Sequence, residues 1–302
     1  FQIFLEKPRS YKELPLRIAE NATVYRFEKT GELNGLLRVR ALTQDDSHTF
    51  LRESQITEEI NRILNFTETT YKTFGFKDYE ARISTHDKKH FEKYLGNEKV
   101  WDKAEKALIS AAKQRKMNYF IGEGEAAFYG PKIDVMVKDA LDRTWQLTTV
   151  QLDFVQPENF NLNYINENGK EERAVVLHIA IFGSVERFLA ILIEQYGGAF
   201  PLWLAPVQAV ILPLGEKHLK FSQKVLEILK ANQLRAEIWE NETISKRIRN
   251  FEIQKIPYAL VIGDKELKSK TVAIRDRDKG DLGEISLTKL LEKLTKEIKS
   301  KK

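Results

Sequence analysis

One short segment carries three polar side chains that could line a single cavity. Side chains alternate between the two faces of an extended strand, so Gln44, Asp46 and His48 would all project to the same side. Burying an amide, a carboxylate and an imidazole together costs free energy unless each group is paired or holds a ligand. This pattern is compatible with a polar binding site and equally with a solvated strand edge at the surface.

A second histidine, His178, lies in the very apolar segment 175–182. A single histidine on an apolar strand is more often a hydrogen-bonded core residue than a metal ligand. His48 and His178 are also too far apart in the sequence to form a metal-binding spacing motif. The residues alone therefore do not predict a metal site.

Arg26, Glu28 and Arg38 lie in the segment 22–42, whose pattern is typical of two strands joined by a polar loop. Arg26 and Arg38 on paired strands would form a rigid pair of guanidinium groups suited to a phosphate or a carboxylate. Glu28 could accept a hydrogen bond from an exocyclic amine. The alternative is an exposed hairpin with cross-strand ion pairs, and the residues alone favour it.

Two further segments, 122–134 and 144–153, are polar where burial is expected. Their polar residues are Tyr129, Lys132 and Asp134 in the first, and Gln146, Thr149, Gln151 and Asp153 in the second. A helix is expected next, with Ser184 as its N-cap. Arg187 would lie in its first turn, where the helix dipole disfavours a cation, so this arginine should have another reason to be there.

An α+β domain with an antiparallel sheet is expected to position these residues. Consecutive strands linked by hairpins, followed by helices, favour that architecture over the first 200 residues. The strands are expected at 22–27, 35–42, 79–84, 133–137, 144–153 and 175–179, and the helices at about 55–74, 98–115 and 184–196.

A break at 197–206, with paired glycines and two prolines, precedes a different pattern. Strands then alternate with helices, which favours a small α/β domain around a mixed sheet. The strands are expected at 207–213, 235–239, 258–262 and 271–275, and the helices at about 216–232, 243–254 and 286–300. We therefore expect two domains, 1–203 and 204–302.

Charge is unevenly distributed along the 302 residues, whose net charge is +5. Residues 206–302 contain 21 lysines and arginines against 14 aspartates and glutamates, and residues 1–205 contain 28 against 30. The basic second part indicates either contact with nucleic acid or a solvated lysine-rich surface. No cysteine is present, which fits a cytoplasmic setting, and no apolar run is long enough for a membrane span.

Several ordered segments together resemble one enzyme family. Segments 25–28, 35–40 and 183–188 resemble motifs 2 and 3 of class II aminoacyl-tRNA synthetases. Segments 43–48, 124–134 and 149–154 resemble threonyl-tRNA synthetases specifically. Segments 256–266, 272–275 and 281–283 are similar to the anticodon-binding domain of the threonyl, prolyl, histidyl and glycyl enzymes. The resemblance covers essentially the whole chain.

The resemblance implies a ligase that activates threonine with ATP and transfers it to tRNA(Thr). Arg26 and Arg187 match the catalytic arginines of motifs 2 and 3. Residues matching the ATP and threonine sites are Glu28, Arg38, Gln44, Asp46, Tyr129, Lys132, Gln146, Thr149, Gln151 and Ser184. Residues matching the positions that read the anticodon are Asn241, Lys255, Glu266 and Arg275.

The resemblance also implies Mg²⁺ with ATP and a zinc ion, with His48 and His178 matching two of its three protein ligands. The third ligand is a cysteine that the resemblance places upstream of Phe1, as it does motif 1. A homodimer for the full-length protein and a cytoplasmic location without a membrane partner are further expectations. This 302-residue chain by itself is expected to be impaired.

Some positions depart from the family pattern. Leu42 replaces a phenylalanine that stacks on adenine, Ile179 replaces an arginine, and Leu-Thr at 147–148 replaces Cys-Gly. Two alternatives remain open. One is a synthetase-like paralogue that binds RNA without aminoacylation, which the missing cysteine and Leu42 support. The other is a prolyl-type synthetase, which would not need His48, His178 and Asp46 together.

Overall fold

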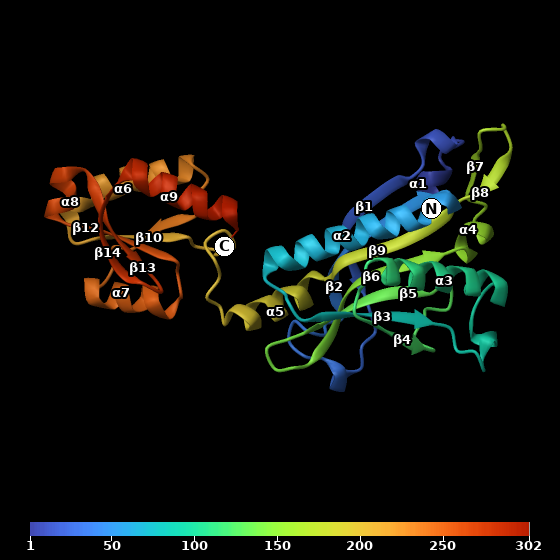
Figure 1. Cartoon of the computed structure of the whole chain (residues 1–302). Helices are drawn as coiled ribbons and strands as arrows, with labels where there is room; N and C mark the ends of the chain where they lie inside the picture. Colours follow the sequence, from blue (N-terminus) through green and yellow to red (C-terminus); the bar gives the residue numbers. More distant parts are fainter. Residues whose placement is uncertain (302) are drawn as a thin grey trace. The chain divides into compact units, whose positions relative to one another are not determined.

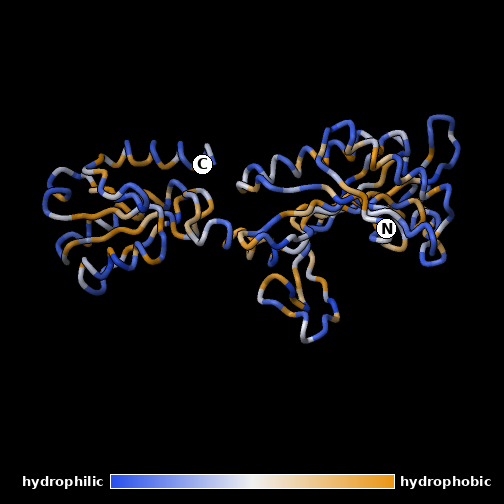
Figure 2. The backbone as a smooth tube through the Cα atoms, turned by 60° about the horizontal axis from the view of Figure 1, so that its bottom comes forward, coloured by the Kyte–Doolittle hydropathy of each residue, from blue (hydrophilic) through white to orange (hydrophobic). Residues whose placement is uncertain are grey.

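A computed structural model describes residues 1–301 and divides the chain into two compact units, Phe1–Leu192 and the part from Ile193 onward (Figure 1). Each unit has its own sheet and its own apolar core. Figure 2 shows apolar residues concentrated on the strands inside each unit, whereas apolar and polar residues alternate along the outer helices. No helix within residues 1–301 is long and apolar enough to cross a membrane.

The first unit is built on a seven-stranded sheet in the order β1-β2-β9-β6-β5-β3-β4. Its strands are β1 (Leu16–Tyr25), β2 (Ala41–Leu51), β9 (Val175–Ser184), β6 (Thr144–Asp153), β5 (Lys132–Lys138), β3 (Tyr79–Thr85) and β4 (Tyr119–Glu123). Every neighbouring pair is antiparallel except β3 and β4, which are parallel. The predicted antiparallel α+β architecture is confirmed.

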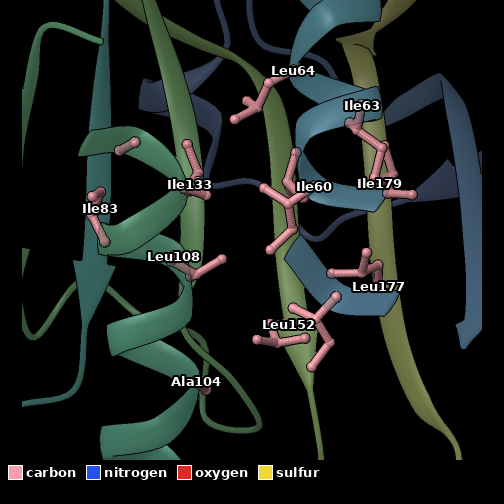
Figure 3. Packing of buried hydrophobic residues seen from close by; sticks show 14 of the residues in the cluster. Ile60, Ile63, Leu64, Ile83, Ala104, Leu108, Ile133, Leu152, Leu177 and Ile179 are labelled. Carbon is pink, nitrogen blue, oxygen red and sulfur yellow. The ribbon is translucent and has the colours of Figure 1, made fainter. Parts of the chain in front are cut away.

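Two helices, α2 (Ile56–Phe74) and α3 (Glu98–Gln114), cover one face of this sheet (Figure 3). Asn97 begins α3 because its side chain accepts a hydrogen bond from the N–H of Val100. Gly75 ends α2 in the left-handed conformation, at φ 81°. The apolar side chains that the helices bury include Ile60, Leu64, Leu108, Ile83, Ile133, Leu152, Leu177 and Ile179.

The helices cover one face of the sheet, and the central strands present polar side chains on the other face. Leu152 and Leu177 point into the core beneath the helices, so their neighbours Gln151 and His178 project to the opposite side. The sheet therefore separates an apolar layer from a polar one.

Shorter elements complete the first unit. They are α1 (Gln2–Leu5), α4 (Val155–Asn159), the hairpin of β7 (Asn163–Ile165) and β8 (Glu171–Arg173), α5 (Val185–Tyr196), and 3₁₀ turns at Tyr11–Glu13, Thr30–Glu32, Glu53–Gln55 and Phe91–Lys93. The sequence pattern does not predict β4, the β7–β8 hairpin, α1 or α4, because elements of three to five residues are too short to show a periodicity.

The predicted strand 35–42 is wrong. Residues 35–40 form a turn instead, in which the N–H groups of Leu37 and Arg38 both donate to the carbonyl of Asn34. Gly35 has φ 47°, a conformation that glycine adopts readily and that interrupts a strand. The strand starts only at Ala41, and its partner β1 starts earlier than predicted, at Leu16.

The second unit contains a five-stranded mixed sheet in the order β11-β10-β12-β13-β14. Strands β11 (Ala236–Ile238), β10 (Ala209–Pro213) and β12 (Tyr258–Ile262) are parallel, and β13 (Thr271–Asp276) and β14 (Gly280–Ser286) continue the sheet antiparallel. The helices are α6 (Glu216–Ala231), α7 (Ile244–Ile253), α8 (Asp264–Ser269) and α9 (Leu287–Ser300). The predicted mixed sheet is confirmed, with β14 and α8 as additions.

Candidate active site

A cavity of about 470 Å³ lies on the polar face of the first sheet. Its walls come from the central strands β2, β5, β6 and β9, from the start of α5, and from Arg26. The predicted site residues that line it are Arg26, Gln44, Asp46, His48, Tyr129, Lys132, Gln146, Thr149, Gln151, His178, Ser184 and Arg187. Segments far apart in the sequence thus meet in one place.

The two histidines are direct neighbours. His48 and His178 are paired residues of the antiparallel strands β2 and β9, and their ring centroids are 4.7 Å apart. Burial, followed by the nearby charge of His178, lowers the pKa of His48, which favours the uncharged imidazole. An uncharged imidazole nitrogen is the form that binds a metal ion.

A buried carboxylate orients His178. Nε2 of His178 lies 2.9 Å from Oδ2 of Asp153, and the other oxygen of Asp153 accepts from the N–H groups of Val155 and Gln156. Because a carboxylate only accepts, Nε2 carries the hydrogen, and Nδ1 is left to hold a ligand.

These residues fit two of the ligands of a tetrahedral zinc site. The chain has no cysteine, and no group of three or more histidine, cysteine, aspartate or glutamate side chains within residues 1–301 could hold a metal ion. The donor set is therefore incomplete in this part of the chain, and the zinc assignment stays a prediction.

The helix dipole disfavours a cation in the first turn of α5, and three other contacts hold Arg187 there. Its Nε donates to the carbonyl of Leu37 at 2.8 Å, Nη1 donates to the carbonyl of Gln146 at 3.3 Å, and the guanidinium lies over the ring of Trp145. Ser184 caps the helix, since its Oγ accepts from the N–H of Arg187. Burial, followed by the charges of Arg26 and Arg38, lowers the pKa of Arg187. Carbonyl groups hold this cation without neutralising it, so it is suited to an anionic ligand.

Glu28 and Arg38 lie outside the residues that line the cavity. Arg38 donates to Glu28 at 3.0 Å and to Glu32 at 3.2 Å, within the loop that joins β1 to β2. Phe27 in the same loop is 96% exposed. The contacts of Glu28 and Arg38 are thus the ion pairs of the alternative interpretation, and their ATP-binding roles stay predictions.

Two carboxylates that sequence analysis did not single out brace the strands around the cavity. Asp45 accepts hydrogen bonds from the three consecutive N–H groups of Ile181, Phe182 and Gly183, at 2.9 to 3.0 Å. Glu186 accepts from the N–H of Thr43 at 2.8 Å. Burial raises the pKa of Asp45, against the effect of these hydrogen bonds. The hydrogen bonds of Asp45 depend on a register shift between Gln44 and Asp46. Such an irregularity has no periodic signal in a sequence, so the sequence does not predict these contacts.

The anticodon candidates fall into two pairs within the second unit. Asn241 and Glu266 follow the ends of the parallel strands β11 and β12. Lys255 precedes β12, and Arg275 pairs with Ala259 at its start. The pairs therefore lie toward opposite ends of β12, separated by roughly 16 Å of strand.

Each of three anticodon candidates also has a contact inside the protein. Glu266 accepts from the N–H of Gly263 at 2.9 Å and so caps α8. Arg275 pairs with Glu252 at 3.2 Å, and Lys255 donates to the carbonyl of Gly197. These contacts leave the predicted role in RNA recognition untested.

Two protein-family matches define the class of protein to which the chain belongs. Residues 1–196 match the family described as tRNA synthetase class II core domain (G, H, P, S and T), and residues 208–297 match the anticodon binding domain. A solved prolyl-tRNA synthetase from Cryptosporidium parvum matches 99% of the chain and 59% of its own length, with a TM-score of 0.69 and 17% identity, which shows the fold alone.

Relatives with higher sequence identity define the family within this class. A threonine–tRNA ligase from Chloroherpeton thalassium is 48% identical over all 302 residues, which correspond to 46% of its own length. The structure of the RNA binding domain of threonyl-tRNA synthetase from Cryptosporidium parvum Iowa II has a TM-score of 0.92 and 38% identity, over 98% of this chain and 74% of that one. The chain belongs to the threonyl-tRNA synthetase family. It spans about half the length of the curated relatives that it matches.

Proposed function

We propose that the chain forms the catalytic and anticodon-binding parts of an enzyme that activates threonine with ATP and transfers it to tRNA(Thr). The composition of a single cavity carries this proposal: His48, His178 and Asp46 line it together with Arg26 and Arg187. A homodimer and a cytoplasmic location belong to the same proposal, and their support is the family.

Selection of the amino acid depends on the hydroxyl group of threonine. Valine has nearly the same shape, and an apolar pocket would separate the two by only about 1–3 kcal/mol. The carboxylate of Asp46 can accept a hydrogen bond from the hydroxyl group, which valine lacks. A zinc ion held by His48, His178 and a ligand from elsewhere would supply open coordination positions for the amino and hydroxyl groups. Serine offers the same two groups, so its rejection requires a separate editing function.

Activation would transfer the adenylyl group. An oxygen of the threonine carboxylate attacks the α-phosphorus of ATP, and the bond to pyrophosphate breaks, which gives threonyl adenylate and pyrophosphate. Arg26 and Arg187 would stabilise the negative charge that develops on the phosphate, with Mg²⁺ accompanying ATP. A ribose hydroxyl of the tRNA would then attack the adenylate carbonyl and release AMP.

Amino-acid-dependent ATP–pyrophosphate exchange by the full-length gene product tests the proposal. We expect exchange with threonine, weaker exchange with serine, and little with valine or proline. Exchange with proline in place of threonine would favour a prolyl-type enzyme. Binding of tRNA without any exchange would favour the non-catalytic paralogue.

The arginines are tested in the same assay. Arg26→Ala and Arg187→Ala should each lower kcat about 100- to 1,000-fold, because each removes a preorganised cation from the developing charge. Arg62→Ala is the matched control, since Arg62 pairs with Glu59 on helix α2. Unchanged exchange in both site variants would rule out these roles.

A further inference from the structure

One fully buried carboxylate, that of Asp134, contacts three of the residues that line the cavity. Asp134 is 0% exposed and lies on β5, where its neighbour Ile133 packs into the core on the other side of the sheet. Across the strands it pairs with Arg82 of β3 and with Thr149 of β6. A buried charge in the middle of a sheet is destabilising unless its neighbours compensate it.

The two oxygens of Asp134 serve different groups. Oδ1 accepts from Nε2 of Gln146 at 2.7 Å and from Oγ1 of Thr149 at 2.9 Å. Oδ2 contacts Nζ of Lys132 at 2.8 Å and accepts from Nη2 of Arg82 at 3.0 Å and from Oγ of Ser84 at 2.9 Å. Every one of these neighbours is a donor, so the site requires a group that accepts on both oxygens.

A bulge brings Gln146 and Thr149 to the same carboxylate. Residues three apart on a regular strand face opposite sides of the sheet. Between Asp134 and Met136 the register of β5 and β6 shifts, so that β6 has one extra residue there and Gln146 turns to the face of Thr149. The amide of Gln146 is then fixed in one orientation, because its oxygen accepts from Arg82 at 3.1 Å and its nitrogen donates to Asp134.

We propose that Asp134 is a positioning residue that couples the amino-acid and ATP parts of the active site. It holds Thr149 and Lys132, which match the threonine pocket, together with Gln146, which matches the adenosine contact. Its charge also balances two cations, Arg82 and Lys132, of which Lys132 lines the cavity that an anionic substrate would enter. This inference rests on the proposed function.

Asp134→Asn is the decisive variant. An asparagine has the same shape, but its amide N–H groups would face other donors on either side, so the polar groups must rearrange. In ATP–pyrophosphate exchange by the full-length gene product, we expect kcat/KM to fall about 100-fold, with higher KM for both threonine and ATP. Gln146→Ala should raise mainly the KM for ATP, and Thr149→Val mainly the KM for threonine.

A double-mutant cycle separates positioning from loss of fold stability. Thr149→Val should lower kcat/KM about tenfold in the parent, and about twofold or less in the Asp134→Asn background. The single amide oxygen of that variant should face the cations Lys132 and Arg82, which leaves an amide nitrogen where the Thr149 hydroxyl had its acceptor. The matched control is Glu59→Gln, which removes another buried carboxylate, one that lies on helix α2 and pairs with two arginines, Arg17 of β1 and Arg62 of α2. It should lower the melting temperature without changing either KM.

The outcomes are distinct. A parent without threonine-dependent exchange would overturn the proposed function itself. An active parent with unchanged KM values in Asp134→Asn, or with fully additive costs in the cycle, would overturn only the coupling role. If Asp134→Asn does not fold, Ser84→Ala carries the test, since it removes one donor to Oδ2. It should raise both KM values several-fold, and unchanged values would reject the inference.

Discussion

At the scale of single residues, side chains behind the cavity wall decide how the wall residues point. Asp153 is fully buried, and one of its oxygens accepts hydrogen bonds from two backbone N–H groups while the other contacts His178. Asp45 holds three consecutive N–H groups at the end of β9 in a similar way. Such partners fix the orientation of a ligand-binding side chain, so they should affect binding although they do not touch the ligand.

Zinc content tests this arrangement without an activity assay. In the full-length gene product, His48→Ala and His178→Ala should each abolish zinc retention after dialysis, and Asp153→Asn should weaken zinc affinity about 10- to 100-fold in competition with a chromophoric chelator. His90→Ala is the control, because His90 lies in a loop with about half of its side chain exposed. A parent that retains no zinc, or a double histidine variant that retains it fully, would contradict the zinc assignment.

At the scale of elements, regular strands were predictable and irregular ones were not. The segment 144–153 was predicted with the bounds that β6 has, and the alternation in β2 placed Gln44, Asp46 and His48 together correctly. The sequence shows Asp134 only as a polar residue in a segment expected to be buried. Its contacts depend on a bulge in β6, which has no periodic signal in the sequence. Residues 35–40 were misassigned, since apolar residues in a tight turn mimic a strand.

The junction of α8, β13 and β14 gives a pH-dependent test in the second unit. An ion pair with Lys265, together with hydrogen bonds from Ser269 and Thr271, lowers the pKa of Glu284 to about 2. A carboxylate with a lowered pKa in the folded state stabilises the fold above its ordinary pKa near 4.5, and that contribution disappears as the pH falls toward 2.

Glu284→Gln should therefore lower the melting temperature of this unit at pH 7 and have no effect near pH 2. Thermal unfolding followed by circular dichroism at several pH values measures the difference. Glu292→Gln, at an exposed position on α9, is the control. A Glu284→Gln effect that stays constant from pH 7 to pH 2 would show that the ion pair does not stabilise the fold.

At the scale of the whole molecule, the proposed function assigns threonine activation to the first unit and anticodon binding to the second. The first unit contains the cavity, and the second contains the excess of lysine and arginine. The anticodon candidates lie toward both ends of β12. Single-stranded loops expose their base edges, so recognition there would combine hydrogen bonds to bases with contacts to phosphates.

Charging of tRNA(Thr) transcripts with altered anticodons tests the second unit. Lys255→Ala and Arg275→Ala should weaken tRNA binding and each reduce its salt dependence by about one ion, if each contacts a phosphate. For Glu266, the glutamine variant can still cap α8, whereas the alanine variant cannot. Loss of anticodon discrimination in both Glu266 variants would indicate base reading, and loss in the alanine variant alone would indicate a structural role.

The partition made by the first sheet also bears on how this scaffold could evolve. Away from the bulge of β6, neighbouring residues of β6 and β9 mostly face opposite sides, so most positions that shape the cavity alternate with those that pack beneath α2 and α3. Ile179 belongs to both sets. Single substitutions can therefore change what the cavity accepts while the hydrophobic layer keeps its stability. A lineage on this scaffold could acquire new amino-acid selectivity in small steps, without first passing through a poorly folded ancestor.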